Sequence, residues 1–468
     1  MTATRRESDA SGAVEIPADR LWGAQTQRAL GVFGGAGPRL QPELLHAFGL
    51  QKAAAAEANL ALGVLDAERA GLIRRAALEM ADGAHDDQFP LPVFQTGSGT
   101  QTNMCANEVI ANRANRMAGQ PLGARAPVHP NDHVNRSQSS NDSFPTVMQI
   151  ASVRMIEGVL LPGAKALAEA MTGRAAAFES IVRLGRTHLN DAVPVTLSQG
   201  FHGYARQIGR AAARLEATLP DLRELPQGGT AAGSGLNAPV GFDRAFCEAL
   251  SALAGTAFTP SPVKVEAMAA HDALVAASAA MEGLAVALVH ILNDIRLLAS
   301  GPRAGLAELR LPDDGLSSSI MPGKRNATLA EALLQVCFRT IGNHATVVAA
   351  GASGLFELNV AKPVLIHAVL ESGLSLADGM ARFREGCLTG LAANMDRMSE
   401  TVARSLMLAT ALTPVLGYDA VARVTRAAEA GDLSLRQACM DEGLLSGEDY
   451  DARVDPLRMA QGGLMEEP

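Results

Sequence analysis

Apolar residues recur at helical spacing along most of the chain, but the length of the patterned stretches changes twice. Residues 1 to about 145 alternate short helical patterns with Gly- and Pro-rich loops such as GVFGGAGP and FPLPVFQTGSGT. Long Ala-rich patterns then predict helices at 144–179, 203–222, 263–298 and 328–350, with a bend or interruption at Pro162 and Gly163. From Lys362 onward the patterns predict shorter helices. We therefore predict a mainly α protein with an N-terminal domain carrying anion-binding loops (1–142), a central domain of long helices (143–361) and a small C-terminal helical domain (362–468).

The 263–298 stretch is the most informative of the long patterns. Its larger apolar residues at helical spacing are Val265, Met268, Met281, Leu284, Leu288, Ile291 and Ile295. Asp272, Glu282 and Asp294 interrupt it too often for the apolar run of roughly 18 residues that a membrane helix needs. A helix that is apolar on nearly every side is buried all round. Self-association would bury it more completely than a monomer, so we expect a homo-oligomer that does not interact with a membrane.

Composition and charge narrow the classes of function. Hydrophobic residues make up 48% of the chain and aromatic residues only 4%, so Ala, Leu, Val and Met fill a large core, which favours helices. The formal charge of −9 argues against a general nucleic-acid binder, although a locally positive pocket would still accept an anionic substrate. The scattered cysteines form no CxxC motif, and the start MTATRRESDASG has no apolar run behind it. We expect a protein of the cytoplasm.

Two polar stretches in the first half of the chain are candidate anion sites. In GSGTQTNMCANE (97–108), Gly97 and Gly99 are predicted to loosen a loop whose hydroxyls precede a helix; simple N-capping is the alternative. In HPNDHVNRSQSSND (129–142), residues 139–141 lie before the next helix in the same way. His129 and His133 have a spacing seen in zinc sites, but Pro130 disfavours a regular helix and no H-E-x-x-H is present, so we predict no metal.

Two later stretches add acid–base groups and positive charge. In GRTHLNDAVP (185–194), His188 lies in a polar turn, where it is either a solvated residue or a proton-transfer group. SSSIMPGKRN (317–326) combines hydroxyls with Lys324, Arg325 and the amide of Asn326. Thr328 to Glu331 has the spacing of a capping box. Taken together, these stretches suit a small dicarboxylate handled by acid–base chemistry without a cofactor.

At these residues the sequence closely resembles class II fumarate hydratase, a member of the fumarase/aspartase superfamily. The matching stretches include GSGTQTNMCANEVIANRA, HPNDHVNRSQSSND, GRTHLNDA, GGTAAGSGLN and SSIMPGKRN, and the similarity runs from IPADRLWGAQTQRAL through FELNVAKP to SLMLATALTPVLGYD. The resemblance implies a fumarase/aspartase-like fold whose long central helix bundle is shared in a homotetramer, with active sites that combine loops from different subunits. It also implies reversible hydration of fumarate to L-malate through an aci-carboxylate intermediate, without a cofactor.

The resemblance also implies roles for particular residues. Ser318 matches the proton-abstracting base, Lys324 a group that stabilises the aci-carboxylate, and His188 the acid/base acting on the departing water, with Glu331 as its carboxylate partner unless Glu331 only caps its helix. Substrate contacts match Ser98, Gly99, Thr100, Ser139, Ser140, Asn141, Thr187, Ser319, Lys324, Arg325 and Asn326. A second, non-catalytic dicarboxylate site matches His129, Pro130, Asn131 and Asp132.

The chain departs from the family pattern at a few positions. It has Ser317 where the family usually has Gly and Ala327 where the family has Pro, so the backbone freedom of the loop that carries Ser318 differs. An Arg that commonly precedes the second-site His is displaced to Arg125, and Ala126 stands in its place.

Two other functions compete with fumarate hydration. Aspartate ammonia-lyase is the nearest, but QSSND and MPGK favour fumarase over the QSTND and MPAK forms typical of aspartase. A non-catalytic scaffold is the alternative from another class, and the intact Ser318, Lys324, Asn326 and His188 argue against it.

Overall fold

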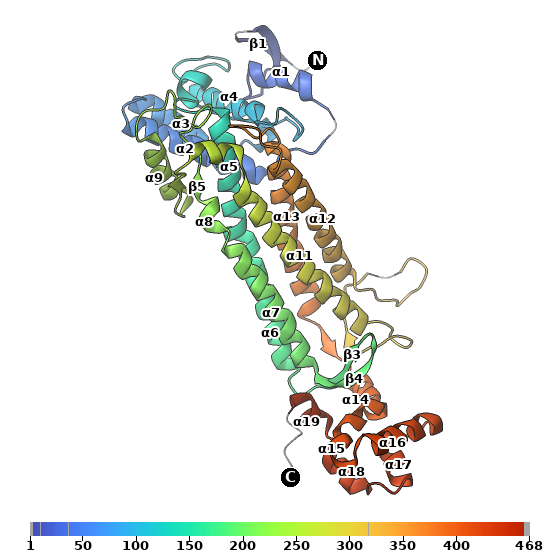
Figure 1. Ribbon diagram of the computed structural model, residues 1–468. Helices are drawn as coiled ribbons and strands as arrows, with labels where there is room; N and C mark the ends of the chain where they lie inside the picture. Colours follow the sequence, from blue (N-terminus) through green and yellow to red (C-terminus); the bar gives the residue numbers. More distant parts are fainter. Residues whose placement is uncertain (1–2, 10, 36, 317, 463–468) are drawn as a thin grey trace. The chain divides into compact units, whose positions relative to one another are not determined.

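The computed structural model describes residues 3–9, 11–35, 37–316 and 318–462 and is predominantly helical (Figure 1). The elements up to the middle of the chain are β1 (Thr4–Asp9), β2 (Gly12–Pro17), α1 (Ala24–Phe33), α2 (Pro42–Ala61), α3 (Ala67–Ala81), η1 (Asp86–Gln88), α4 (Thr100–Met117), η2 (Pro130–Val134), α5 (Ser140–Met155), η3 (Ile156–Leu160), α6 (Leu161–Ala177), β3 (Val182–Thr187), β4 (Asn190–Thr196), α7 (Leu197–Glu216), α8 (Leu219–Leu222) and β5 (Glu224–Leu225). They are followed by α9 (Phe242–Ala254), β6 (Thr259–Pro260), α10 (Lys264–Ala269), α11 (Asp272–Leu298), β7 (Leu309–Arg310), α12 (Thr328–Gly351), α13 (Lys362–Phe383), η4 (Arg384–Leu388), β8 (Ala392–Ala393), α14 (Met395–Arg404), η5 (Leu406–Leu412), α15 (Thr413–Leu416), α16 (Tyr418–Gly431), α17 (Leu435–Asp441), α18 (Gly447–Arg453) and α19 (Pro456–Gln461).

The chain forms two compact units, each assembled from three segments. Unit 1 comprises Met1–Pro162, Ala211–Val286 and Val336–Ala377, and unit 2 comprises Gly163–Arg210, Ala287–Gln335 and Asp378–Pro468. The long helices α7, α11, α12 and α13 each contribute residues to both units. The three domains predicted from the sequence divide the chain by consecutive segments, and that division remains a prediction.

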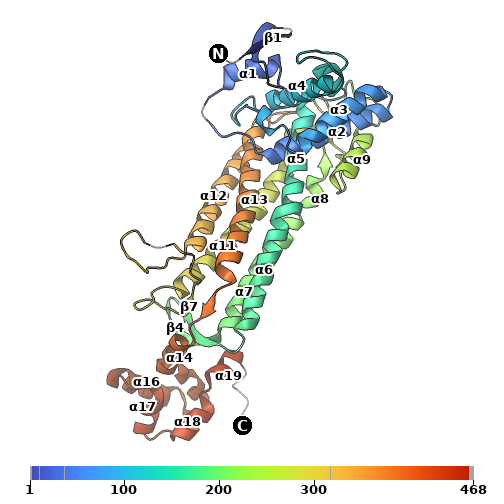
Figure 2. The ribbon, with the colours of Figure 1, turned by 180° about the vertical axis from the view of Figure 1, so that it is seen from behind.

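Unit 1 is organised around α2, which packs against α3, α5 and α9. Helices α2 and α3 lie side by side in both views (Figure 1 and Figure 2). Their close approach requires Gly49, because a Cβ there would lie 2.4 Å from the backbone nitrogen of Ala81. Phe48 of α2 and Phe144 of α5 meet edge to face with ring centroids 5.8 Å apart. The core of this unit therefore fixes the starts of α4 and α5, which follow the predicted anion-binding loops.

Unit 2 contains the antiparallel hairpin β3–β4 and the C-terminal helices. A hydrophobic cluster joins Leu184 of β3 to Val402, Leu412, Val424 and Tyr450 from those helices. This packing anchors the base of the hairpin whose turn contains His188.

Several predicted helices are confirmed, with differences at their interruptions. Helix α12 matches the predicted 328–350 stretch, and the predicted 144–179 helix is α5 and α6 with the π-helical turn η3 (156–160) just before Pro162. The predicted 203–222 stretch is α7, which begins earlier, at Leu197, followed by the separate α8.

Other helix predictions were wrong in extent. The 263–298 stretch is not one helix, because Ala270 is extended (φ −103°, ψ 145°) and separates α10 from α11. The short helices expected from Lys362 begin only at α14, since α13 has 22 residues and buries an apolar face that includes Leu365, Val369 and Leu376. In the N-terminal region, α2 has 20 residues and α4 has 18, so these helices are longer than predicted.

The long helices retain apolar surface that the single chain does not cover. By length and composition alone, Ser140–Ala177, Asp272–Leu298 and Lys362–Leu388 could each span a membrane, so the prediction that Asp272, Glu282 and Asp294 interrupt the 263–298 stretch too often for a membrane helix was wrong. Only 50% of the most apolar window of α11 is buried. Val286 and Leu297 on α11 and Phe338 on α12 are 55%, 45% and 57% exposed. Apolar surface of this kind favours protein association.

Candidate active site

The loop before α4 is held by close packing, which contradicts the prediction that its glycines loosen it. A Cβ on Gly97 would lie 1.3 Å from the carbonyl oxygen of Val360, and a Cβ on Gly99 would lie 2.0 Å from the ring of Phe144. Gly99 also has a φ of +74°, which disfavours any other residue. The loop is therefore rigid, and Ser98 is buried within it with its hydroxyl 2.8 Å from that of Thr100.

The hydroxyls of this loop do not cap α4 in the ordinary way. The N-cap residue is Gly99, which has no side chain, and the Thr102 N–H donates to Oε1 of Gln95 at 3.2 Å. Ser98 and Thr100 are bonded to each other instead. The N-capping alternative for these two hydroxyls is thus wrong, and they are left at a helix start, where backbone N–H groups favour an anion.

The second stretch turns through η2 and then caps α5. The Ser139 hydroxyl accepts from the Asn141 N–H at 3.2 Å, while the Ser139 N–H donates to Asp142 at 2.9 Å, which completes a capping box. The side-chain amide of Asn141 donates to the carbonyl of Ala231 at 2.9 Å. Residues 139–141 are therefore tied to the glycine-rich GGTAAGSGLN loop.

Asp142 is the group that joins these two loops, although it was not among the predicted site residues. Its carboxylate is fully buried and accepts from the backbone N–H groups of Gly228 at 3.0 Å and Thr230 at 2.9 Å, and from the Gln227 side chain at 3.1 Å. Burial raises the pKa of Asp142 to about 6, against the lowering effect of these hydrogen bonds. The Ser-x-x-Asp spacing of a capping box was the sequence signal for it.

Residues of the predicted second site lie beside the predicted substrate contacts. A cavity of about 660 Å³ in unit 1 is lined by Asn131 and Asp132 of the second site, by Ser139, by Thr230 and by residues 236–239. Arg125, the displaced arginine, instead donates to the carbonyl of Ser8.

The two histidines of this stretch make local backbone contacts. Nδ1 of His129 accepts from the N–H groups of Asn131 and Asp132, both at 3.2 Å, and Nδ1 of His133 accepts from the His129 N–H at 2.8 Å. Over the described residues, His, Cys, Asp and Glu side chains form no group of three or more that could hold a metal ion.

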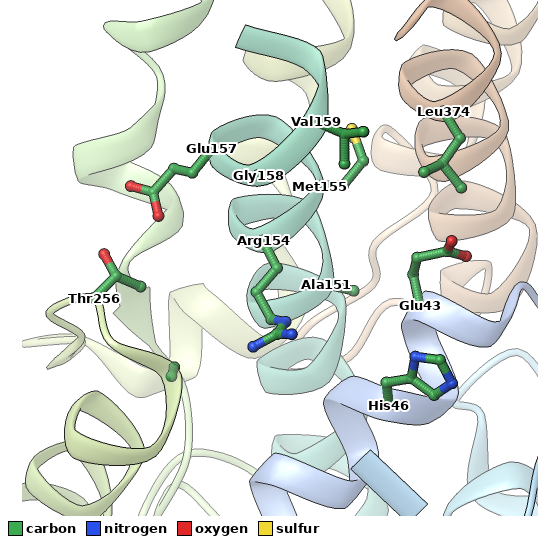
Figure 3. Close-up of a pocket in the computed structure, with 11 residues that line it drawn as sticks. Glu43, His46, Ala151, Arg154, Met155, Glu157, Gly158, Val159, Thr256 and Leu374 are labelled. Carbon is green, nitrogen blue, oxygen red and sulfur yellow. The ribbon is translucent and has the colours of Figure 1, made fainter. Parts of the chain in front are cut away.

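A different cavity, of about 430 Å³, lies between α2, α5 and α13 in unit 1 (Figure 3). Arg154 projects from α5, and Glu43 and His46 of α2 line the same cavity (Figure 3). Its lining contains none of the predicted site residues.

In unit 2, His188 occupies the tip of the β3–β4 hairpin. His188 and Leu189 have φ values of 55° and 63°, as expected for the two-residue turn that matches strand twist. The side chain of Asn190 donates to the carbonyl of His188 at 3.1 Å, and Arg186 pairs with the buried Glu308 below the tip. His188 and its neighbour Thr187 are exposed, and the imidazole has no partner within the described part of the chain.

The loop that carries Ser318 also lies in unit 2 and is largely exposed. The Ser318 hydroxyl oxygen accepts from the backbone N–H groups of Ile320 at 3.4 Å and Met321 at 3.3 Å. Lys324 and Asn326 are exposed, whereas Arg325 pairs with Asp313 at 2.9 Å. Ser319 is also exposed. Ser317 lies outside the described residues.

Among the described residues, Glu331 makes neither of its two predicted contacts. Its carboxylate accepts from Arg296 at 3.3 Å, and the Thr328 hydroxyl donates to Asp314. The helix instead begins with the Ala327 carbonyl accepting from the Glu331 N–H at 2.9 Å. Tertiary contacts have replaced the capping box.

The predicted residues thus fall into two sets. Unit 1 contains the substrate contacts at 98–100 and 139–141 and the second site at 129–132. Unit 2 contains Thr187, His188, the 318–326 loop and Glu331. The first set consists of residues predicted to bind anions, and the second adds the predicted acid–base residues.

Comparison with known proteins defines the class of this fold and site. A family model described as "Lyase" matches residues 12–342, and one described as "Fumarase C C-terminus" matches 408–461. The chain is 50% identical to class II fumarate hydratase of Caulobacter vibrioides, over 99% of this chain and 100% of that protein. It is 48% identical to class II fumarate hydratase of Rhizobium meliloti, over 98% and 99% of the two chains. The crystal structure of class II fumarase from Schistosoma mansoni matches with a TM-score of 0.94 at 38% identity, covering 98% of this chain and 99% of that chain.

These matches place the chain among the lyases. More narrowly, it belongs to the class II fumarate hydratase family, whose activity is that of a hydro-lyase. The predicted mainly α, fumarase-like fold and the family resemblance are both confirmed.

Proposed function

We propose that the protein catalyses the reversible hydration of fumarate to L-malate, through an aci-carboxylate intermediate and with the residues assigned above. The observation that carries this proposal is the full-length match to class II fumarate hydratases. The local geometry of the Ser318 loop and of the two helix starts supports the assignment of roles.

When L-malate is dehydrated to fumarate, Ser318 removes the proton from the carbon beside one carboxylate. That carboxylate then carries two negative charges, which preorganised donors must stabilise. Lys324 and Asn326, on the same loop as Ser318, provide an ammonium and an amide for this purpose. The N–H groups of Ile320 and Met321 face the Ser318 oxygen, and such hydrogen bonds favour an alkoxide-like form over the neutral hydroxyl.

His188 supplies the proton to the hydroxide that leaves the adjacent carbon. An imidazole suits this step because it exchanges a proton near neutral pH. Its place on a hydrogen-bonded hairpin tip fixes the backbone while leaving the ring exposed. Glu331 is assigned as its carboxylate partner in the assembled enzyme.

The substrate carboxylates are bound by the hydroxyl and amide groups at the starts of α4 and α5. Ser98 and Thr100 lie in the rigid loop before α4, and residues 139–141 are capped onto α5. Thr187, Ser319 and Arg325 complete the contacts, and residues 129–132 form a second dicarboxylate site. The cavity shared by Ser139, Asn131 and Asp132 supports placing the two dicarboxylate sites close together.

The functional form is a homotetramer of the cytoplasm that needs neither nucleic acid nor membrane. The exposed apolar residues of α11 and α12 support association through the long helices. In this assembly the three sequence domains (1–142, 143–361 and 362–468) meet so that loops of different subunits form each site.

An ultraviolet assay of fumarate absorbance tests the function. Purified protein should consume fumarate without ammonium and form fumarate from L-malate. Consumption only in the presence of ammonium would identify an aspartate ammonia-lyase, and an oligomer that converts neither substrate would identify a scaffold.

A further inference from the structure

A buried lysine on α2 contacts both helix starts of the proposed substrate site. Lys52 is 0% exposed, and its Nζ donates to Oδ1 of Asn103 at 2.8 Å, Oε1 of Gln138 at 2.9 Å and Oδ1 of Asn135 at 3.2 Å. Asn103 lies in the first turn of α4, and Gln138 immediately precedes Ser139. An ammonium has three N–H donors and no acceptor, so the three amide oxygens match it.

The amide groups around Lys52 are themselves fixed by further hydrogen bonds. Oδ1 of Asn135 also accepts from the side chains of Asn103 at 3.2 Å and Asn107 at 3.1 Å. The side-chain amide of Gln138 donates to the carbonyls of Val134 and Arg136, both at 3.0 Å. These hydrogen bonds restrain the amides in the buried interior, where Oδ1 of Asn107 is left without a partner among the described residues.

The network depends on the charged form of Lys52. A neutral amine has one donor fewer and a lone pair, so one amide oxygen would face that lone pair. The charged group that acts on Lys52 in the described part of the chain is Asp142, and no carboxylate touches the ammonium. Burial lowers the pKa of Lys52 to about 7, partly opposed by Asp142.

We propose that Lys52 is a positioning residue for the dicarboxylate site. Its ammonium fixes the spacing between the first turn of α4, which contains Thr100, and the α5 start, which contains Ser139. This inference rests on the proposed assignment of those two residues as substrate contacts. Lys52 itself lies beneath the site and acts through Asn103 and Gln138.

The first test is Lys52→Met in the full-length oligomeric enzyme, with fumarate kinetics from about pH 6 to about pH 9. We expect KM to rise about tenfold or more while kcat changes much less, because binding geometry is lost and the acid–base groups remain. In the wild type, KM should increase at pH values above about 7, because Lys52 loses its proton there. This increase should be absent in the variant. Lys264→Met, which removes a lysine paired with Asp243 in the same unit, is the control and should keep the wild-type KM.

A second variant decides the question if Lys52→Met does not fold. Asn135→Asp places a carboxylate against the Lys52 ammonium and should raise the pKa of Lys52, so the increase in KM should begin at a pH about one unit or more higher. Wild-type KM in Lys52→Met, or an unshifted rise in Asn135→Asp, would overturn the positioning role.

Ser139→Ala separates this inference from the site assignment beneath it. If Ser139→Ala raises KM and Lys52→Met does not, only the role of Lys52 fails. If neither variant changes KM, the assignment of Ser139 as a substrate contact fails as well, and the role of Lys52 with it.

Discussion

Replacement of Asp142 by Asn tests whether one buried carboxylate holds the proposed substrate loop in place. The substitution preserves shape but leaves one acceptor oxygen and one NH₂ group. The wild-type carboxylate accepts from the backbone N–H groups of Ser139, Gly228 and Thr230, from the Gln227 amide and, at 3.4 Å, from the Ser143 hydroxyl. Asparagine keeps most of these bonds only if its oxygen faces the 227–230 segment, and its NH₂ then faces the Ser139 N–H.

The magnitude follows from that count. One backbone N–H loses its acceptor, which costs about 1–3 kcal/mol, and the bonds that remain change from charge-assisted to neutral. Relief of the buried charge offsets part of this loss. We take about 2 kcal/mol as the net effect. Each 1.4 kcal/mol corresponds to about a tenfold change in an equilibrium. If this free energy is lost from the positioning of Ser139 against the substrate, kcat/KM for fumarate should fall about 30-fold.

The assay is initial-rate hydration of fumarate, with oligomer size and Tm measured on the same samples. Asp86→Asn is the matched control, because Asp86 pairs with His46 in the same unit and touches neither loop. It should retain wild-type kcat/KM.

The pH dependence of this variant provides a sharper criterion. The pKa of Asp142 is raised to about 6, so below that pH the wild-type carboxyl takes up a proton and resembles asparagine. The difference in kcat/KM between wild type and Asp142→Asn should therefore shrink as the pH falls below about 6. A folded Asp142→Asn enzyme with wild-type kcat/KM would refute the reasoning, as would a ratio that does not change with pH.

Four further outcomes are expected. Ser318→Ala should lower kcat by about 100-fold or more without changing Tm, because it removes the base from an exposed loop; a near-normal kcat in either direction would exclude Ser318 as the base. His188→Asn should lower kcat by a similar factor of about 100, and unchanged pH–rate profiles would show that His188 does not transfer the proton. Glu331→Gln should change the free energy of unfolding by less than about 1 kcal/mol, because its ion pair with Arg296 is half exposed, and it should lower kcat about tenfold or more. A lower Tm with normal turnover would make Glu331 purely structural. Burial lowers the pKa of His271 to about 3, so between about pH 6.5 and pH 3 the unfolded chain binds a proton that the folded chain does not, and the free energy of unfolding should fall as the pH drops. His271→Asn should reduce that fall in denaturant titrations, and an unchanged pH dependence of stability would contradict the reasoning.

Much of the architecture follows from local sequence, and the exceptions have identifiable causes. The apolar pattern at 328–350 predicts α12 because its buried residues recur on one face. Nothing local predicts the break at Ala270, since neither it nor His271 is a helix-breaking residue. The rigidity at Gly97 and Gly99 arises from contacts with Val360 and Phe144, which are distant in sequence.

The candidate site shows the same division between local and tertiary signals. The hydroxyls and amides of 98–100, 139–141 and 318–326 are visible as polar motifs that precede helices. Lys52 reads as an ordinary charged residue in an Ala-rich helix, because the amide oxygens that bind it come from other segments. Thr328 and Glu331 have capping-box spacing, but Asp314 and Arg296 bind them instead. Residue types predict the chemistry of the site, whereas tertiary contacts decide the partners.

The exposure of the proposed catalytic and donor groups links the proposed catalysis to assembly. A doubly charged aci-carboxylate is stabilised best by fixed donors in a site from which water is excluded. His188, Lys324 and Asn326 are exposed in the single chain, so this chain alone does not enclose them. Val286, Leu297 and Phe338 expose apolar surface on the long helices, and burying it would bring other subunits against the same molecule. In the proposed tetramer, the apolar surface that favours association would therefore also supply walls for the active site.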